Sequence, residues 1–377
     1  MTDEVESAAE DTTVPARKRR RWPAIALTAV VLAGVAAGAS WLMLGDHRSA
    51  EEIALDDFRT ARQGLTKAAG AHYTGKLTDR DGKWVALDLR VTNVGEVSGT
   101  VEIAPGQWVD YLHVDDKTFM KGTRAAWIAD GASEEAATGS DGKQVSRHYV
   151  FHGITLSSAL NPSVLGKQLD NSASSGSALV VGEPVAIDDH AATPISSGGV
   201  TTYVRDGRVS RIVNATFDIR VTPLSTTEVD TLYSDLVPVV TALADASDSE
   251  KKIEHNAGWS TPCARTCSAL STITATAQPF IAITGPGVAS ANTDTIIAYS
   301  IGLTFAGVDQ DRPDCVGTAT IPANGSTTVS CAFEPPPGSD VTSAIWARAI
   351  FGQARADQLV KALENNADRS RYKATRS

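Results

Sequence analysis

Two histidines have the most suggestive chemical spacing in this 377-residue sequence. His148 and His152 lie four residues apart, and on a helix this spacing would let both imidazoles bind one metal ion. The intervening Tyr149, Val150 and Phe151 favour a strand, in which both rings point to one side but stand farther apart. The sequence therefore predicts no metal site.

Candidate acid–base groups are equally sparse. Asp188-Asp189-His190 contains suitable side chains, but it lies between two strand-like runs and is predicted to be a solvated turn. Glu134 and Glu135 fall within Gly131–Lys143, a polar, glycine-containing segment predicted to be a loop. The sequence contains no nucleophile elbow, zinc-protease motif, phosphate-binding loop or dinucleotide-binding motif. We therefore expect no enzymatic activity and no cofactor.

The four cysteines are Cys263, Cys267, Cys315 and Cys331. An even number of clustered cysteines in an exported region predicts disulfide bonds. Cys315 and Cys331 flank two β-rich runs around Asn324-Gly325, and a hairpin there would bring their sulfur atoms together. The favoured pairing is Cys315–Cys331 with Cys263–Cys267. A four-cysteine zinc site is the alternative, although neither pair has the usual C-x-x-C spacing.

Composition and charge exclude two broad classes of protein. Apolar residues make up 42% of the chain and charged residues 21%, which is typical of folded domains and argues against general disorder. The formal net charge of −10 argues against nucleic-acid binding, which requires a basic surface.

An uncharged segment near the N-terminus predicts a membrane anchor. Residues 24–44 contain no charged side chain and, as a helix rising about 1.5 Å per residue, would span about 31 Å. Trp22 and Trp41 lie near its ends, and five basic residues at Arg17–Arg21 precede it. By the positive-inside rule, residues 1–21 form a cytoplasmic tail, and the chain after the span lies outside the cell membrane.

The alternative is a cleaved signal peptide, because Ala37-Gly38-Ala39 resembles a cleavage site. The apolar run continues through Leu44, beyond that site, so a retained signal anchor with a single span is favoured.

The first exported region is predicted to combine helices with an antiparallel sheet. A helix is expected at Ala54–Ala69, followed by a meander of strands over His72–Lys121. Further strands are expected at Pro184–Ile195 and Val200–Arg205. Helices are predicted at Leu160–Leu169, capped by Asn161, and at Thr226–Ala246, which begins with a capping box at Ser225.

Alternation along these strands predicts one continuous apolar face. Val209–Val221 has the clearest alternation and is predicted to be a single strand. The residues of the apolar face expected to contact a ligand, if a cavity lies there, are Val85, Leu87, Leu89, Val101, Ile103, Val213, Phe217 and Ile219. The same pattern would also suit an ordinary filled core.

The distal region is predicted to be a separate unit. The charged segment Ser247–Ala257 marks the expected boundary, and strand-like runs over 255–352 suit a small disulfide-bonded β-sandwich. Residues 354–377 are expected to form a helix over Ala354–Asn365 and then a frayed basic tail, Asp368–Ser377.

The layout of residues 50–246 resembles the LppX/LprG lipoproteins of the mycobacterial envelope, which belong to the LolA-like group. The features that carry the resemblance are the meander, Trp127 soon after it, the Asn161-Pro162 helix, strands around Asp206-Gly207 and the closing helix. It implies an α+β fold in which a curved antiparallel half-barrel sheet and its helices hold acyl chains. It also implies an actinobacterial cell envelope.

The chain departs from that family in its anchor. Those lipoproteins are attached through a lipid-modified cysteine, whereas this sequence has no cysteine before Cys263, so the span at 24–44 would replace that attachment. The expected function is binding of lipid or lipoglycan acyl chains at the outer face of the cell membrane. The alternative is a non-enzymatic scaffold for envelope assembly that binds a protein partner.

Overall fold

The computed structural model describes residues 48–78, 82–147, 155–174, 178–248, 251–259, 267–277, 294–305, 308–310, 315–323, 325–335 and 341–376. The predicted cytoplasmic tail and membrane span lie outside the described residues, as do Cys263 and the pair His148 and His152. Within these ranges, no helix combines the length and the apolar character needed to cross a bilayer.

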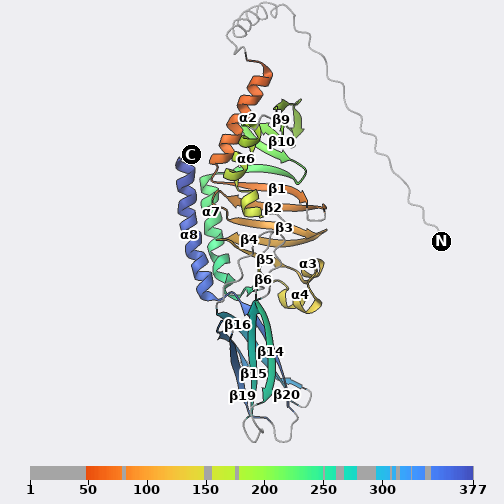
Figure 1. Ribbon diagram of the computed structural model, residues 1–377, viewed down its shortest axis with the longest axis vertical. Coiled ribbons are helices and arrows are strands. Elements are labelled where there is room, and N and C mark those ends of the chain that lie inside the picture. Colours follow the sequence, from red (N-terminus) through yellow and green to blue (C-terminus); the bar gives the residue numbers. More distant parts are fainter. Residues whose placement is uncertain are drawn as a thin grey trace, which may run out of the picture. The chain divides into compact units, whose positions relative to one another are not determined.

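The first region contains a curved antiparallel sheet that does not close into a barrel (Figure 1). Neighbouring strands follow the order β9-β10-β11-β12-β1-β2-β3-β4-β5-β6. Their bounds are β1 Gly70–Thr78, β2 Trp84–Thr92, β3 Val97–Ala104, β4 Gln107–Val114, β5 Lys117–Gly122, β6 Gln144–Arg147, β9 His190–Ser197, β10 Val200–Arg205, β11 Arg208–Val213 and β12 Phe217–Leu224. Two short strands, β7 (Val180–Val181) and β8 (Val185–Ile187), pair with β9. The predicted meander is confirmed.

Two glycines let the strands coil closely. Gly75 in β1 and Gly99 in β3 have φ angles of 146° and 150°. A Cβ atom at Gly75 would lie 2.3 Å from the Asp218 carbonyl oxygen, and one at Gly99 would lie 2.1 Å from that of Asp88. Since no other residue fits there, these glycines permit the sharp coiling of a curved sheet.

Three of the helices that cover one face of this sheet, here called the inner face, position the candidate site. They are α2 (Ala50–Lys67), α5 (Leu156–Ala159) and α6 (Pro162–Ser174), and their buried side chains share one apolar cluster with the strands. The predicted cap of α6 is confirmed, because Asn161 Oδ1 accepts hydrogen bonds from the backbone N–H groups of Ser163 and Val164 at 3.0 and 3.3 Å.

The segment predicted to be a loop, Gly131–Lys143, contains a helix instead. Helix α4 (Glu134–Ser140) follows α3 (Arg124–Ala129), and Ser133 Oγ caps it by accepting a hydrogen bond from Ala136 N at 3.3 Å. The Trp127 indole joins the two helices by donating to the Ser140 carbonyl at 3.0 Å. Glu134–Ala137 favour a helix, and the Ser133 cap and this tertiary contact offset the glycines on either side.

Two further helices pack on the opposite face, over β4 and β5. Helix α7 (Thr226–Thr241) has the predicted Ser225 capping box and continues into the 3₁₀ turn η1 (Ala242–Asp245). Helix α8 (Gln353–Arg376) lies beside α7, and both share an apolar cluster with β-strand residues Leu112 and Phe119 (Figure 1). The predicted frayed tail is wrong, because α8 remains helical to Arg376.

The distal region consists of two facing sheets, so its strands form a sandwich. One sheet contains β14 (Lys251–Trp259), β15 (Cys267–Ala277) and β19 (Ser326–Phe333). The other contains β16 (Thr295–Phe305), β17 (Val308–Gln310), β18 (Val316–Ile321) and β20 (Val341–Ile350). Apolar residues from both sheets form one buried cluster.

The Cys315–Cys331 disulfide is confirmed, but the predicted hairpin is wrong. Strand β18 pairs with β16 and β19 pairs with β15, so the bond joins the two sheets, with the Cα atoms 5.1 Å apart. Both cysteines are buried in the sandwich core. The pairing of Cys263 with Cys267 stays a prediction, since Cys263 is outside the described residues.

The two regions are joined through β13 (Ser247–Asp248). It pairs in parallel with β6 of the half-barrel and antiparallel with β20 of the sandwich, through Ser247 in both cases. Asp248, which is 2% exposed as a side chain, pairs with Arg355 of α8 at 2.7 Å. The limits of the two domains stay a prediction.

Candidate ligand-binding site

The inner face of the sheet is lined by side chains that alternate along each strand. Tyr73 in β1 lies directly across from Leu89 in β2 and Val221 in β12. All three are buried in the cluster that includes α2, α5 and α6. The period of two, visible in the sequence, therefore predicts this face well.

Most of the predicted ligand-contact residues are brought together here. Val85, Leu87, Leu89, Val101, Ile103 and Ile219 are buried in this cluster, and Phe217 packs against it while partly buried. Val213 is partly exposed and lies outside the cluster. The structure shows where these side chains lie, and their contact with a ligand stays a prediction.

Val213 is misplaced because Val209–Val221 is a hairpin and not a single strand. Asn214 Oδ1 accepts hydrogen bonds from the backbone N–H groups of Thr216 and Phe217 at 2.7 and 2.8 Å, which ends β11 and starts β12. Ile212, which lies opposite Ile219, faces the core in place of Val213. Arg211 then pairs with Asp218 across the hairpin through two hydrogen bonds of 2.7 and 2.8 Å.

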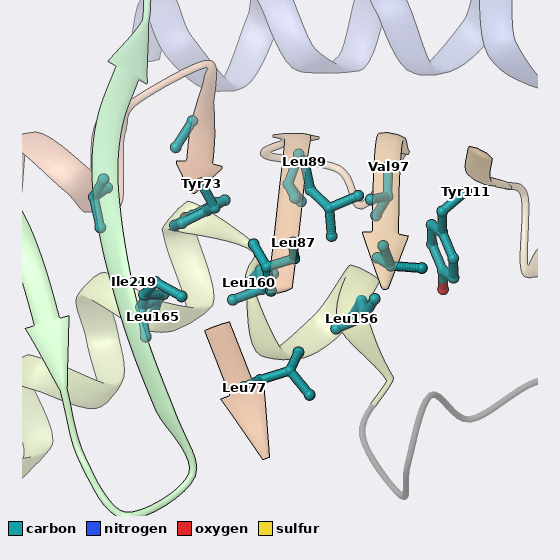
Figure 2. Packing of buried hydrophobic residues seen from close by; sticks show 14 of the residues in the cluster. Tyr73, Leu77, Leu87, Leu89, Val97, Tyr111, Leu156, Leu160, Leu165 and Ile219 are labelled. Carbon is teal, nitrogen blue, oxygen red and sulfur yellow. The ribbon is translucent and has the colours of Figure 1, made fainter. Parts of the chain in front are cut away.

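The helices supply a second set of apolar side chains. Leu156, Leu160, Leu165 and Leu169 are all buried, and in Figure 2 Leu160 lies beside Leu87 and Leu165 beside Ile219 of the sheet. Sequence reasoning predicted a helix at this position but did not assign its leucines to the site. Their spacing of four, five and four residues was the available signal. We call these leucines, together with Tyr73, Leu87, Leu89 and Ile219, the inner layer.

Helix α6 is held to α2 by polar and close backbone contacts. A Cβ atom at Gly166 would lie 2.3 Å from Thr66 Oγ1, so the two helices cross closely there. Arg62 of α2 pairs with Asp170 at 2.8 Å. At the start of α6, Asn161 Nδ2 donates a long hydrogen bond of 3.4 Å to the Thr92 carbonyl of β2.

Tyr73 carries the one polar side-chain atom of the inner layer. Its ring is fully buried, and its hydroxyl has no hydrogen-bond partner among the described residues. Burial raises the pKa of Tyr73 well above its ordinary value, so the hydroxyl stays protonated and can donate a hydrogen bond. The sequence gives no sign of this, because it shows a tyrosine in a strand but not its partners.

A buried polar network on the other face of the sheet is fully engaged. Glu96, which is 2% exposed, accepts hydrogen bonds from Thr92 Oγ1 at 2.6 Å, Tyr233 OH at 2.9 Å and Asn366 Nδ2 at 2.6 Å. Burial, followed by the nearby Glu96 charge, raises the pKa of Tyr233. We call Thr92, Glu96, Tyr233 and Asn366 the α8 clamp, since they tie α7 and α8 to the turn after β2.

Two surface hollows among the described residues have several charged residues in their lining. One of about 390 Å³ is lined by Lys76, Arg211, Asp218 and Arg220 on the outer side of β1 and β12. Its cations are engaged: Arg211 with Asp218, Arg220 with Asp188 at 3.0 Å, and Lys76 over the Trp84 ring at 4.9 Å. A second, of about 370 Å³, adjoins Arg205, Asp206 and Arg208. Neither resembles an acyl-chain site.

The remaining chemical candidates do not assemble into a site. Asp188 and Asp189 have φ angles of 50° and 62°, and they form an exposed turn between β8 and β9, as predicted. His190 Nδ1 lies 2.6 Å from the Asp188 carbonyl. In the part of the chain that the structure describes, no three His, Cys, Asp or Glu residues are grouped so that they could hold a metal ion.

No family model and no curated protein sequence matches this chain. Among solved structures, it is similar to LprF from Mycobacterium bovis, with 13% identity over 46% of this chain and 94% of LprF, at a TM-score of 0.32. It is also similar to a chain of the MucA/MucB complex from Pseudomonas aeruginosa, with 11% identity over 81% of this chain and 96% of that chain, at a TM-score of 0.24. These likenesses are distant, and neither assigns a ligand, a partner or a family to this protein.

Proposed function

We propose that this protein holds acyl chains of a lipid or lipoglycan between the inner face of the half-barrel sheet and helices α5 and α6. The observation that carries the proposal is the apolar character of the inner layer. Sheet and helices satisfy their own backbone hydrogen bonds and meet through leucine, valine and isoleucine side chains. An acyl chain entering this layer would replace one set of apolar contacts by another.

To admit an acyl chain, the helices must separate from the sheet, and the contacts of α6 indicate at which end this separation begins. Its ion pair and close crossing fix α6 to α2, whereas leucines face the sheet. At the start of the helix, the Asn161–Thr92 hydrogen bond holds one end to β2. We infer that α2 and α6 move together. Because the start of α6 is held to β2, the contact between α6 and the sheet opens from the other end of the helix, at Ser174.

The proposal includes a location. The uncharged segment at 24–44 would act as a single-span anchor, so the half-barrel would work at the outer face of the cell membrane and accept lipid there. The same anchor would bring the protein close to any envelope protein that receives or delivers the lipid.

Photolabelling of the full-length chain tests this function. The chain is placed in nanodiscs containing a phospholipid with a diazirine halfway along one acyl chain, irradiated, and mapped by peptide mass spectrometry. We expect labels on β2 and α6, at residues such as Leu87 and Leu165. Labelling restricted to residues 24–44 and the outer face of the sheet would contradict the proposal.

A matched pair of variants makes this test specific. Ala71→Phe adds a ring at a fully buried position of β1 on the inner face, whereas Ala86→Phe adds the same ring on the outer side of β2. Ala71→Phe should reduce labelling of α6 at least several-fold, because it occupies the space the acyl chain needs. Ala86→Phe should leave it unchanged, and circular dichroism checks that both variants fold.

A further inference from the structure

The buried hydroxyl of Tyr73 is out of place in its surroundings. Its cross-strand neighbours on the inner face are Leu89 and Val221, and the labelled side chains of residues 155–174 in Figure 2 are all leucines. An unpaired buried donor costs free energy, and phenylalanine would fill the same space without that cost. The position therefore carries a polar group that the closed fold does not use.

We infer that Tyr73 is the polar anchor of the inner layer and donates a hydrogen bond to the ester carbonyl oxygen of an acyl-chain ligand. This inference rests on the proposed function and adds to it a specific contact and a ligand class. The hydroxyl is a donor at neutral pH, as in any tyrosine, and burial raises its pKa further. A carbonyl oxygen in the same apolar layer would gain the most from such a donor, since water cannot compete there.

The surroundings select a neutral acceptor. The cluster around Tyr73 consists of uncharged side chains, so an ionised carboxylate would be buried there without a cation, at a high cost in free energy. Arg62 of α2 lies over the Phe58 ring of this cluster, 4.8 Å from its centroid, but already pairs with Asp170 at 2.8 Å. An ester is therefore favoured over a free fatty acid.

The ligand can be varied at one atom to test this contact. Binding of a diacyl ester lipid, its dialkyl ether analogue and a free fatty acid is measured by titration of the delipidated full-length chain in detergent. Tyr73→Phe should weaken ester binding roughly five-fold, the effect of losing one neutral hydrogen bond, and should leave ether binding unchanged. The wild-type chain should prefer the ester to the fatty acid at pH 7.

Tyr111→Phe is the matched control. Tyr111 is buried in the same cluster, but its hydroxyl is engaged with Thr118. Tyr111→Phe should lower the Tm of the ligand-free chain without changing the ester-to-ether ratio. Tyr73→Phe should leave that Tm unchanged or raise it, because no partner is lost.

The outcomes separate the anchor from the site. An equal effect of Tyr73→Phe on ester and ether binding, or a loss of ligand-free Tm like that of Tyr111→Phe, would overturn the role of Tyr73 and leave the lipid-binding proposal standing. If neither lipid binds to the wild-type chain, the proposed function itself fails.

Discussion

The inner layer and the α8 clamp lie on opposite faces of one sheet and differ in how their buried polar groups are hydrogen-bonded. In the α8 clamp, three donors converge on Glu96, and the hydroxyl of Tyr233 is engaged. In the inner layer, apolar side chains meet and the hydroxyl of Tyr73 has no partner among the described residues. Directional bonds specify one closed arrangement, whereas apolar contacts can be exchanged for others. The α8 clamp is therefore suited to holding α7 and α8 permanently against the sheet, and the inner layer is suited to binding an apolar ligand.

The largest expected effect is in the clamp. Glu96→Ala would remove the buried acceptor that Thr92, Tyr233 and Asn366 share, and we expect a loss of about 3 kcal/mol in the free energy of unfolding. Urea denaturation measures it. Glu364→Ala, at an exposed position of the same helix α8, should change stability by less than about 0.5 kcal/mol. Equal effects would show that the network does not hold α8.

A pair of leucine truncations compares the two regions directly. Leu160→Ala in the inner layer and Leu363→Ala in α8 each remove a buried side chain and should each cost about 2.5 kcal/mol. Added ester lipid should restore the Tm of Leu160→Ala, because an acyl chain can fill the space, but not that of Leu363→Ala. Restoration of both, or of neither, would remove the distinction.

Tyr233→Phe removes one engaged hydroxyl from the clamp. We expect the free energy of unfolding to fall by about 1 kcal/mol, since Glu96 loses one of its buried donors. Thermal unfolding with and without ester lipid measures this, and the lipid-induced rise in Tm should match that of the wild-type chain. A smaller rise would mean that the clamp also responds to ligand.

The smallest effect concerns the Arg211–Asp218 pair, which belongs to neither the inner layer nor the α8 clamp. The hydrogen bond from Arg211 holds the pKa of Asp218 below its ordinary value in the folded state. The pair therefore stabilises the fold fully at pH values above the ordinary pKa of aspartate. This stabilisation is lost as the pH falls through the lowered pKa of the folded state. Asp218→Asn should lower the free energy of unfolding by about 0.5 kcal/mol at pH 7, and should have no effect at a pH below the lowered pKa of Asp218. Asp110→Asn, at an exposed position of β4, is the control.

The sequence predicted the elements of this fold better than their partners. Alternation along Val85–Ile103 identified the inner face, because burial on one side of a strand imposes a period of two. It failed over Val209–Val221, where the Asn214 turn reverses the chain within an uninterrupted pattern. The Cys315–Cys331 disulfide was predicted correctly but for the wrong reason. The strands next to the two cysteines do not pair as a hairpin; they belong to different sheets, which the disulfide joins.

The contacts that matter most for function depend on tertiary structure. Asp368–Ser377 looks like a solvated tail in the sequence, but Ser370 is fully buried and Lys373 Nζ donates to the Asn93 carbonyl at 3.2 Å. The isolation of the Tyr73 hydroxyl is equally invisible, because it depends on strands and helices far apart in the chain. Local periodicity predicts which face a residue occupies, but not which group, if any, it meets there.

Hydrogen exchange of the full-length chain, with and without ester lipid, tests the central claim most directly. If acyl chains enter the inner layer, lipid should slow amide exchange in residues 155–174 and in β1 and β2, while exchange in α8 stays unchanged. Amide exchange that is the same with and without lipid over residues 155–174, or that slows in α8 instead, would contradict the binding of acyl chains in the inner layer.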